Sequence, residues 1–183
     1  SSMMRPREPK DWKFGYQRHW DRDLLTSSMR TEHSDISIRR FTEAISGKVE
    51  PISRLFKLAP DGISNTLRAG TDSSRGAFSS PRPIHFRDRR VISIREMARL
   101  HGFPDWFRLH ATKWHGGRQV GNAVPPLLAY EIGLKVMKGL QLEPKRPRRE
   151  IALGDEALIN YSLEAACRYF GVDNPIGKRN MKS

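Results

Sequence analysis

The sequence predicts an α+β fold in which a small, irregular region of short strands precedes a set of helices. Between Val49 and Arg90, short apolar pieces alternate with PDG, SSRG and SSPRP, a pattern typical of short strands joined by turns. After Arg90, apolar residues recur at helical spacing. The chain has 183 residues, of which 37% are hydrophobic, and this is sufficient for one core.

A basic and aromatic arm comes first, over residues 3–32. It mixes charged residues with Trp12, Phe14, Tyr16 and Trp20 but shows no clear period. Such interleaving can contact nucleic acid, and it can equally belong to an arm packed on its own domain. We favour packing on the domain.

A short helix is predicted next, over residues 37–45. Ile38, Phe41 and Ile45 lie at helical spacing, Ser37 is a candidate N-cap, and Gly47 is expected to end the helix.

The segment TLRAGTDSSRGAF, residues 66–78, is suited to contacting DNA. Gly70 and Gly76 permit tight turns, while Arg68 and Arg75 carry charge that suits a phosphate or a guanine edge. The same composition also describes an ordinary flexible surface loop.

The stretch from Val91 to Phe107 contains a sharply bounded helix. Ser93 followed by Glu96 forms a capping box, which predicts that the helix begins at Ile94. Gly102 and Pro104 are expected to end it.

Residues 118–126, RQVGNAVPP, are interpreted as a polar turn, and RLHATKWHGG before them as a loop. Pro126 suits the first turn of a following helix. That helix carries an apolar stripe, which is expected to be buried against another domain and to be exposed, or covered by self-association, in the chain alone: Leu128, Ile132, Val136 and Leu140.

The order of TLRAG, SIREMARLHGFPDWF and GRQVGNAVPPLLAYEIG resembles the C-terminal part of carbon-5 cytosine DNA methyltransferases, over about His33 to Leu140. In that family the segment before the Arg-Glu helix is the variable target-recognition domain, and the Arg-Glu helix is the ninth conserved motif, which supports that domain. The Gln-x-Gly-Asn-x-Val turn and its helix are the tenth motif, which closes one side of the S-adenosylmethionine pocket. The resemblance implies a β-rich target-recognition domain, followed by helices that would pack on a doubly wound, Rossmann-like methyltransferase domain absent from this chain.

The resemblance also implies roles for individual residues. Asn122 and Ala123 fall on the turn that meets the cofactor, although Ala123 lacks the hydroxyl that a serine would offer there, and a helix-capping role would also explain Asn122. The expected DNA contacts are Thr66, Arg68, Gly70 and Arg75. The expected architectural residues of the two motifs are Arg95, Glu96, Arg99, Gly102, Pro104, Asp105, Gln119 and Gly121.

The residues that perform the chemistry in that family are absent from the sequence. The family uses a cysteine in a Pro-Cys-Gln loop to attack a flipped cytosine, an acid in a Glu-Asn-Val strand, and a Phe-x-Gly-x-Gly turn that cradles the cofactor. Cys167 lies in EAACRYF instead and is interpreted as a small packed residue. We therefore expect no catalytic residue here and no activity from the chain alone.

Charge and composition indicate the partners. A net charge of +13 favours double-stranded DNA, although a solvated basic surface is the simpler alternative. The catalytic half of the methyltransferase is the second expected partner. No metal site is expected, since His110 and His115 are not at the spacing of a helical zinc pair. No apolar run is long enough for a membrane span, and one cysteine fits a reducing cytosol. The expected location is cytoplasmic, with nucleoid association if the protein is prokaryotic.

The sequence divides into an arm (3–32), a target-recognition domain (33–90), two motif helices (91–142), and a basic linker with a helical extension that Gly171 ends (143–183). Three functions remain open. The chain is a subunit or piece of a split methyltransferase, a DNA-binding remnant or regulatory module, or a basic domain with inherited architecture only.

Overall fold

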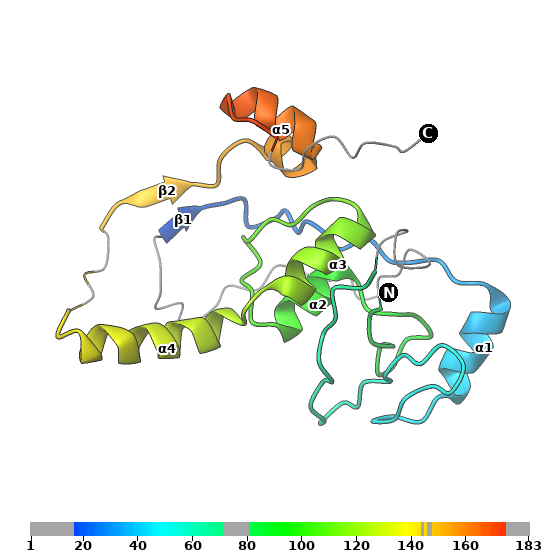
Figure 1. Ribbon diagram of the computed structural model, residues 1–183. Helices are drawn as coiled ribbons and strands as arrows, with labels where there is room; N and C mark the ends of the chain where they lie inside the picture. The colour runs from blue at the N-terminus through cyan, green and yellow to red at the C-terminus, as the bar shows by residue number, and fades with distance from the viewer. Residues whose placement is uncertain (1–16, 72–80, 144, 146–147, 175–183) are drawn as a thin grey trace, which may run out of the picture. The chain divides into compact units, whose positions relative to one another are not determined.

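The computed structural model describes residues 17–71, 81–143, 145 and 148–174. Trp12, Phe14 and Tyr16 of the predicted arm lie outside these ranges, as does Arg75. The chain divides into two compact units, Ser1–Leu153 and Gly154–Ser183. The described residues form an α+β structure with few strands, so the predicted class is confirmed (Figure 1).

The first unit contains four α-helices and one pair of strands in its described residues. Strand β1 pairs in parallel with β2, and Gln17 lies opposite Glu150. Glu150 was assigned to the linker by the sequence, but it begins β2. In chain order the elements are β1 (Gln17–His19), α1 (Asp35–Glu43), α2 (Ile94–Leu100), α3 (Lys113–Asn122), α4 (Pro126–Gly139) and β2 (Glu150–Ala152).

The region of predicted short strands holds isolated bridges in its described residues. These bridges join Val49 to Phe56, Lys57 to Ile84, and Ile84 to Val91. Proline has no N–H to donate to a ladder, and the region carries four prolines that interrupt longer pairing: Pro51, Pro60, Pro81 and Pro83.

Helix α1 begins one turn earlier than predicted. Ser34, not Ser37, is the N-cap, and the Ser34 side chain accepts a hydrogen bond from the Ser37 N–H. The sequence signal was ambiguous because both residues are serines. At the other end of the helix, Lys57 is buried and its Nζ donates to the Phe41 carbonyl at 2.7 Å. A cation at a helix C-terminus is favourable, so Lys57 caps α1.

Helix α2 begins at Ile94 as predicted. The Ser93 side chain accepts from the Glu96 N–H, and the Ser93 N–H donates to the Glu96 carboxylate, which completes the capping box. After the helix ends, Gly102 takes a φ of +87°, a conformation that favours glycine.

Helix α3 corrects the prediction of a loop followed by a polar turn. Residues 113–122 are helical, with Thr112 as N-cap. Gln119, Gly121 and Asn122 therefore lie within a helix and not in a turn before the next helix. Gly116 suggested a loop, but it allows close packing. A Cβ there would lie 3.0 Å from both the His110 carbonyl oxygen and the Ile94 side chain.

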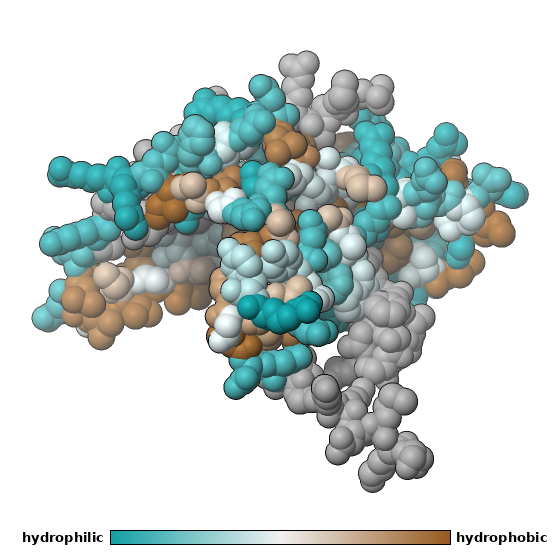
Figure 2. All heavy atoms as spheres, turned by 90° about the horizontal axis from the view of Figure 1, so that it is seen from above, coloured by the Kyte–Doolittle hydropathy of each residue, from teal (hydrophilic) through white to brown (hydrophobic). Residues whose placement is uncertain are grey.

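Helix α4 begins at Pro126, as predicted, and its apolar stripe is exposed. None of its residues is buried, and Ile132 is 52% and Val136 53% exposed. This exposure agrees with the expected apolar patch, and its covering by self-association stays a prediction. Figure 2 shows apolar residues gathered over α4, at the left of the view. No helix in the described ranges is long and apolar enough to cross a membrane.

The second unit contains a 3-10 helix, Glu156–Asn160, and helix α5, Leu163–Phe170. Helical structure was predicted here, with Gly171 as the stop, and Gly171 ends α5 at a φ of +62°. Cys167 is buried, as its interpretation as a packed residue requires.

The core of the first unit lies around α2. One cluster joins it to α3 and to the segment before Arg68: Leu58, Leu67, Ile92, Ile94, Met97, Ala98, Leu109 and Val120. A smaller cluster holds α1: Phe41, Ile84 and Val91.

Arg95 is a fully buried cation at the centre of this unit, with 0% of its surface exposed. Its guanidinium donates to the carbonyl oxygens of Thr26, Pro104 and Phe107 and to the Thr26 hydroxyl, at 2.8–3.1 Å. Burial lowers its pKa to about 10, opposed by the nearby Asp105 carboxylate. The side chain therefore stays charged at neutral pH and joins three separate segments.

Replacement of Arg95 is expected to destabilise the first unit strongly. Arg95→Met should lower the free energy of unfolding by about 3–5 kcal/mol, because the acceptors lose their donors. Chemical denaturation monitored by circular dichroism measures this. Arg39→Met, at an exposed position on α1, is the matched control and should change stability by less than about 0.5 kcal/mol. Equal stability of the two variants would contradict the role of Arg95.

Candidate functional site

The segment predicted to begin the DNA contacts lies directly on helix α3. A Cβ at Gly121 would lie 2.5 Å from the Arg68 carbonyl carbon and 2.6 Å from the Ala69 Cα. Only glycine permits this approach. On the same helix, Trp114 Nε1 donates to the Thr71 carbonyl oxygen at 3.0 Å. Helix α3 therefore holds the segment at two points.

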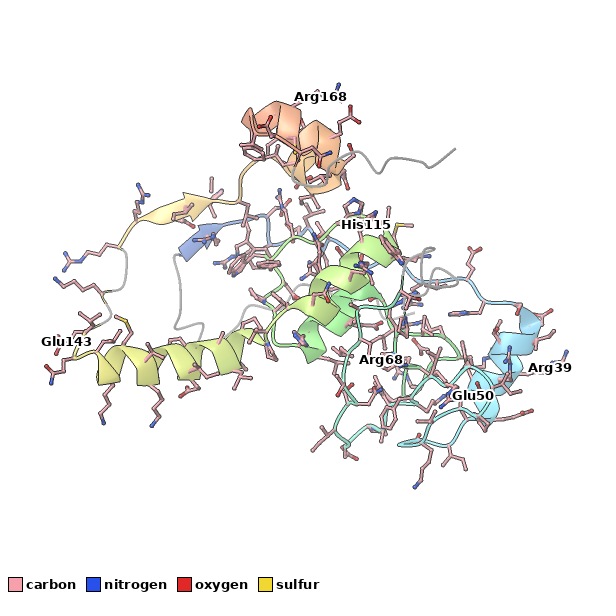
Figure 3. All side chains as sticks on the ribbon, in the orientation of Figure 1. Arg39, Glu50, Arg68, His115, Glu143 and Arg168 are labelled. Carbon is pink, nitrogen blue, oxygen red and sulfur yellow. The ribbon has the colours of Figure 1, made fainter. Side chains whose placement is uncertain are left out.

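The side chains of this segment alternate between the core and solvent. Leu67 is buried in the core cluster, whereas Thr66 and Arg68 on either side of it are exposed. Gly70 turns the chain at a φ of +78°. Arg68, labelled in Figure 3, is thus presented from an anchored backbone. Arg75 lies outside the described residues.

The two predicted cofactor residues lie where α3 ends. Asn122 is the last residue of the helix and is exposed, and Ala123 is its C-cap. Both backbone polar groups of Ala123 have partners within the chain. Its N–H donates to the Val120 carbonyl, and its carbonyl oxygen lies 2.8 Å from His101 Nε2. Of this pair, Asn122 is the residue whose side chain can hydrogen-bond to a ligand.

Gln119 fixes the loop that leads into α3. Its Oε1 accepts a hydrogen bond from the His110 N–H at 2.8 Å. The His110 and His115 rings lie 4.5 Å apart, beside Trp114. In the described residues, no group of three or more His, Cys, Asp or Glu side chains is placed to hold a metal ion.

The charged residues of the ninth motif are paired within the chain. Arg99 donates to both carboxylate oxygens of the buried Asp105, at 2.7 and 2.9 Å. Glu96 accepts two bonds from Arg90, at 2.7 and 2.9 Å. Burial alone would raise the pKa of Glu96, but the bonds from Arg90 and from the Ser93 N–H prevail and lower it to about 2. These pairs join α2 to the residues directly before and after it.

Sequence reasoning missed two buried arginines. Arg82 donates to the Ile92 carbonyl oxygen and to the Thr31 hydroxyl, each at 2.8 Å, and Arg90 binds Glu96. Both lie in a basic stretch that resembled solvated surface. No local pattern marks Arg82, because its Thr31 partner is far away in the sequence, whereas Glu96 is only six residues from Arg90.

The family model for C-5 cytosine-specific DNA methylases matches residues 4–138. The chain belongs to this family. This chain is 50% identical over 182 residues to Type II methyltransferase M.XorII of Xanthomonas oryzae pv. oryzae, a match that covers 100% of this chain and 43% of that protein. DNA (cytosine-5)-methyltransferase 1 of Gallus gallus is 53% identical over 55 residues, which are 30% of the chain and 4% of that protein.

A solved structure also resembles this chain. It is that of a candidate DNA modification methyltransferase encoded within a prophage (E. coli), with a TM-score of 0.53 and 40% sequence identity. The likeness covers 64% of this chain and 30% of that chain. This chain therefore spans less than half the length of M.XorII and of the chain in that solved structure.

Three histidines of the chain accept backbone hydrogen bonds through a ring nitrogen: His33, His85 and, from the Thr112 N–H, His110. His33 Nε2 accepts from the Val91 N–H at 3.2 Å, and His85 Nδ1 accepts from the N–H groups of Arg87 and Asp88. Burial lowers the pKa of both from the ordinary 6.5. Neighbouring cations, Arg82 for His33 and Arg90 for His85, lower the pKa further. Protonation of these nitrogens would break the bonds.

Stability should therefore fall in mild acid. Below pH 6.5 the histidines of the unfolded chain bind protons that those of the folded chain do not. The contribution of these histidines to the free energy of unfolding is therefore fully present above this pH. It falls as the pH drops through the lowered folded pKa values. Urea denaturation between pH 7.5 and 5 measures the slope. The double variant with His33→Gln and His85→Gln should reduce the slope and leave the part that comes from His110, whose pKa is also lowered by burial. An unchanged slope would contradict the assignment.

The packing of the 66–71 segment on Gly121 can be tested by adding one methyl group to this glycine. Gly121→Ala should displace the segment and lower the free energy of unfolding by about 1–3 kcal/mol, because the Cβ overlaps backbone that cannot move aside alone. Gly133→Ala on α4 is the control, since a Cβ there meets nothing within 4 Å. It should be neutral or stabilising by up to about 1 kcal/mol. Similar losses in both variants would show that the contact is not the cause.

Proposed function

We propose that this chain is the DNA-recognition segment of a DNA (cytosine-5)-methyltransferase, active only together with the polypeptide that carries the catalytic motifs. The combined enzyme would transfer a methyl group from S-adenosylmethionine to cytosine in a specific DNA sequence. The packing of Arg68 and Ala69 on Gly121 carries this proposal. It joins the candidate DNA segment to the helix that ends at Asn122, the candidate cofactor residue.

DNA would be contacted from the exposed side of the 66–71 segment. Thr66 offers a hydroxyl and Arg68 a guanidinium, which suits a phosphate or a guanine edge. The backbone turn at Gly70 permits close approach to the DNA, and the net charge of +13 favours association. Arg75 is proposed as a further contact from its place in the sequence.

The cofactor would be held from one side only. S-adenosylmethionine, when bound, supplies the methyl group. On this chain the exposed Asn122 side chain would hydrogen-bond to it, whereas the backbone of Ala123 is already engaged by His101 and Val120. The chain thus fits one wall of the pocket, and the nucleophile and the remaining walls belong to the partner.

The catalytic partner would dock on the apolar stripe of α4. Exposed Ile132 and Val136 line a hollow together with Glu131 and Lys135, and Leu128 and Leu140 extend the stripe along the helix. A contiguous exposed apolar face of this kind marks an interaction site. The chain matches 43% of M.XorII, and the further polypeptide of that relative supports the proposal that a partner covers this face. Because the enzyme acts on DNA, we infer a cytoplasmic, nucleoid-associated location.

A non-catalytic DNA-binding module is the second candidate. The 66–71 segment is anchored by residues of this chain, namely Leu67, Gly121 and Trp114, and this supports DNA binding without a partner.

Reconstitution separates the two candidates. The chain is mixed with the part of M.XorII that it does not match, and transfer of a labelled methyl group to DNA is assayed. We expect transfer from the mixture and none from either polypeptide alone. Tight DNA binding by the chain, without methyl transfer in the presence of any natural partner, would favour the non-catalytic module.

Two variants divide the proposed functions of the chain. Ile132→Lys places a charge in the apolar stripe and should abolish association and methyl transfer while DNA binding by the chain is kept. Arg68→Ala should keep association but weaken binding to the preferred DNA sequence, by about 1–3 kcal/mol if Arg68 contacts a base. Loss of association in Arg68→Ala, or normal transfer with Ile132→Lys, would contradict these assignments.

A further inference from the structure

A stacked pair of side chains lies beside the 66–71 segment and is not explained by the motifs. The Arg118 guanidinium carbon lies 4.8 Å from the centre of the Trp114 ring, one turn away on α3. The His115 ring meets the same indole edge to face, with centroids 4.6 Å apart. Trp114 and Arg118 are both half-buried, and His115, which is labelled in Figure 3, is exposed.

Trp114 links this stack to the candidate DNA segment. Its indole N–H donates to the Thr71 carbonyl oxygen, directly after the turn at Gly70. The indole is therefore fixed at its edge by Thr71 while its face carries Arg118. A movement of the segment would move the ring, and with it the guanidinium.

The stack leaves the donors of Arg118 in a suitable geometry for an anion. Cation–π stacking uses the flat face of a guanidinium, and its N–H donors lie in the plane and point outward from the edge. A phosphate accepts two such donors side by side. The ring holds the guanidinium in one orientation, which reduces the entropy lost when a ligand binds.

We propose that Arg118 contacts a phosphate of the DNA backbone and that Trp114 positions it beside Thr71. The inference rests on the proposed DNA-recognition function and adds a second contact point to it. Arg68 lies on the segment and Arg118 on α3, and the Gly121 packing and the Trp114–Thr71 bond fix the two elements together. The phosphate contact sets the position of the duplex and carries no sequence information itself.

Salt dependence distinguishes a phosphate contact from a structural one. The full chain is titrated with a short duplex of mixed sequence at several salt concentrations. Arg118→Gln should reduce the magnitude of the slope of log K against log salt by about 0.9, the value for one phosphate. The loss of affinity between 50 and 200 mM salt then becomes about threefold smaller. Arg118→Lys, which keeps the charge, should retain the slope.

Two further variants complete the test. Arg39→Gln, on the exposed face of α1, should leave the slope unchanged. Trp114→Phe keeps a ring for Arg118 but removes the donor to Thr71, so it should weaken binding without changing the slope by a full phosphate. An unchanged slope in Arg118→Gln, with binding by the unaltered chain intact, would overturn this inference alone. Absence of DNA binding by the unaltered chain would overturn the proposed function as well.

Discussion

The buried guanidinium of Arg95 is the constraint on which the first unit depends. A charged side chain can be buried only where its N–H groups have hydrogen-bond acceptors. Arg95 has such acceptors on Thr26, Pro104 and Phe107. Two segments, the distant one around Thr26 and the one from Pro104 to Phe107 after α2, must therefore converge on α2 before the charge can be buried. The part of the arm around Thr26 is thus held on its own unit, which agrees with the interpretation favoured for the arm.

Helix α3 connects α2, which carries Arg95, to the candidate DNA segment. Gly116 lets the helix approach Ile94 on α2, and Gly121, further along, admits the backbone of Arg68 and Ala69. The positions of these two glycines place α2 and the segment against different faces of one helix. At Gly121 the contact is made with backbone atoms, whereas at Gly116 the partner on α2 is the Ile94 side chain. The two glycines therefore let α3 pack closely on both α2 and the segment.

Local sequence signals predicted local structure well. The capping box of α2, Pro126 at the start of α4 and Gly171 after α5 act within one helical turn, so the sequence suffices to find them. Helix α3 was missed because Gly116 and Gly121 lower helix propensity, and their reason for being glycine lies in distant neighbours. The basic balance was misleading in the same way. Arg82, Arg90 and Arg95 contribute to the charge of +13, yet they bind partners inside the unit, and so the basic surface is smaller than the composition suggests.

The stripe on α4 shows why the helical period alone could not predict burial. The spacing of Ile132 and Val136 is that of a core face, but no described residue of the chain covers it. Burial of one such side chain is worth about 1.5–3 kcal/mol, so a partner that covers the stripe would gain substantial binding energy. Only Ala123, Val124 and Pro125 separate α3 from α4, and a proline restricts its own backbone and that of the residue before it. A partner docked on α4 would therefore also constrain the orientation of α3. Because α3 carries the 66–71 segment, association and DNA recognition would be mechanically coupled through Gly121.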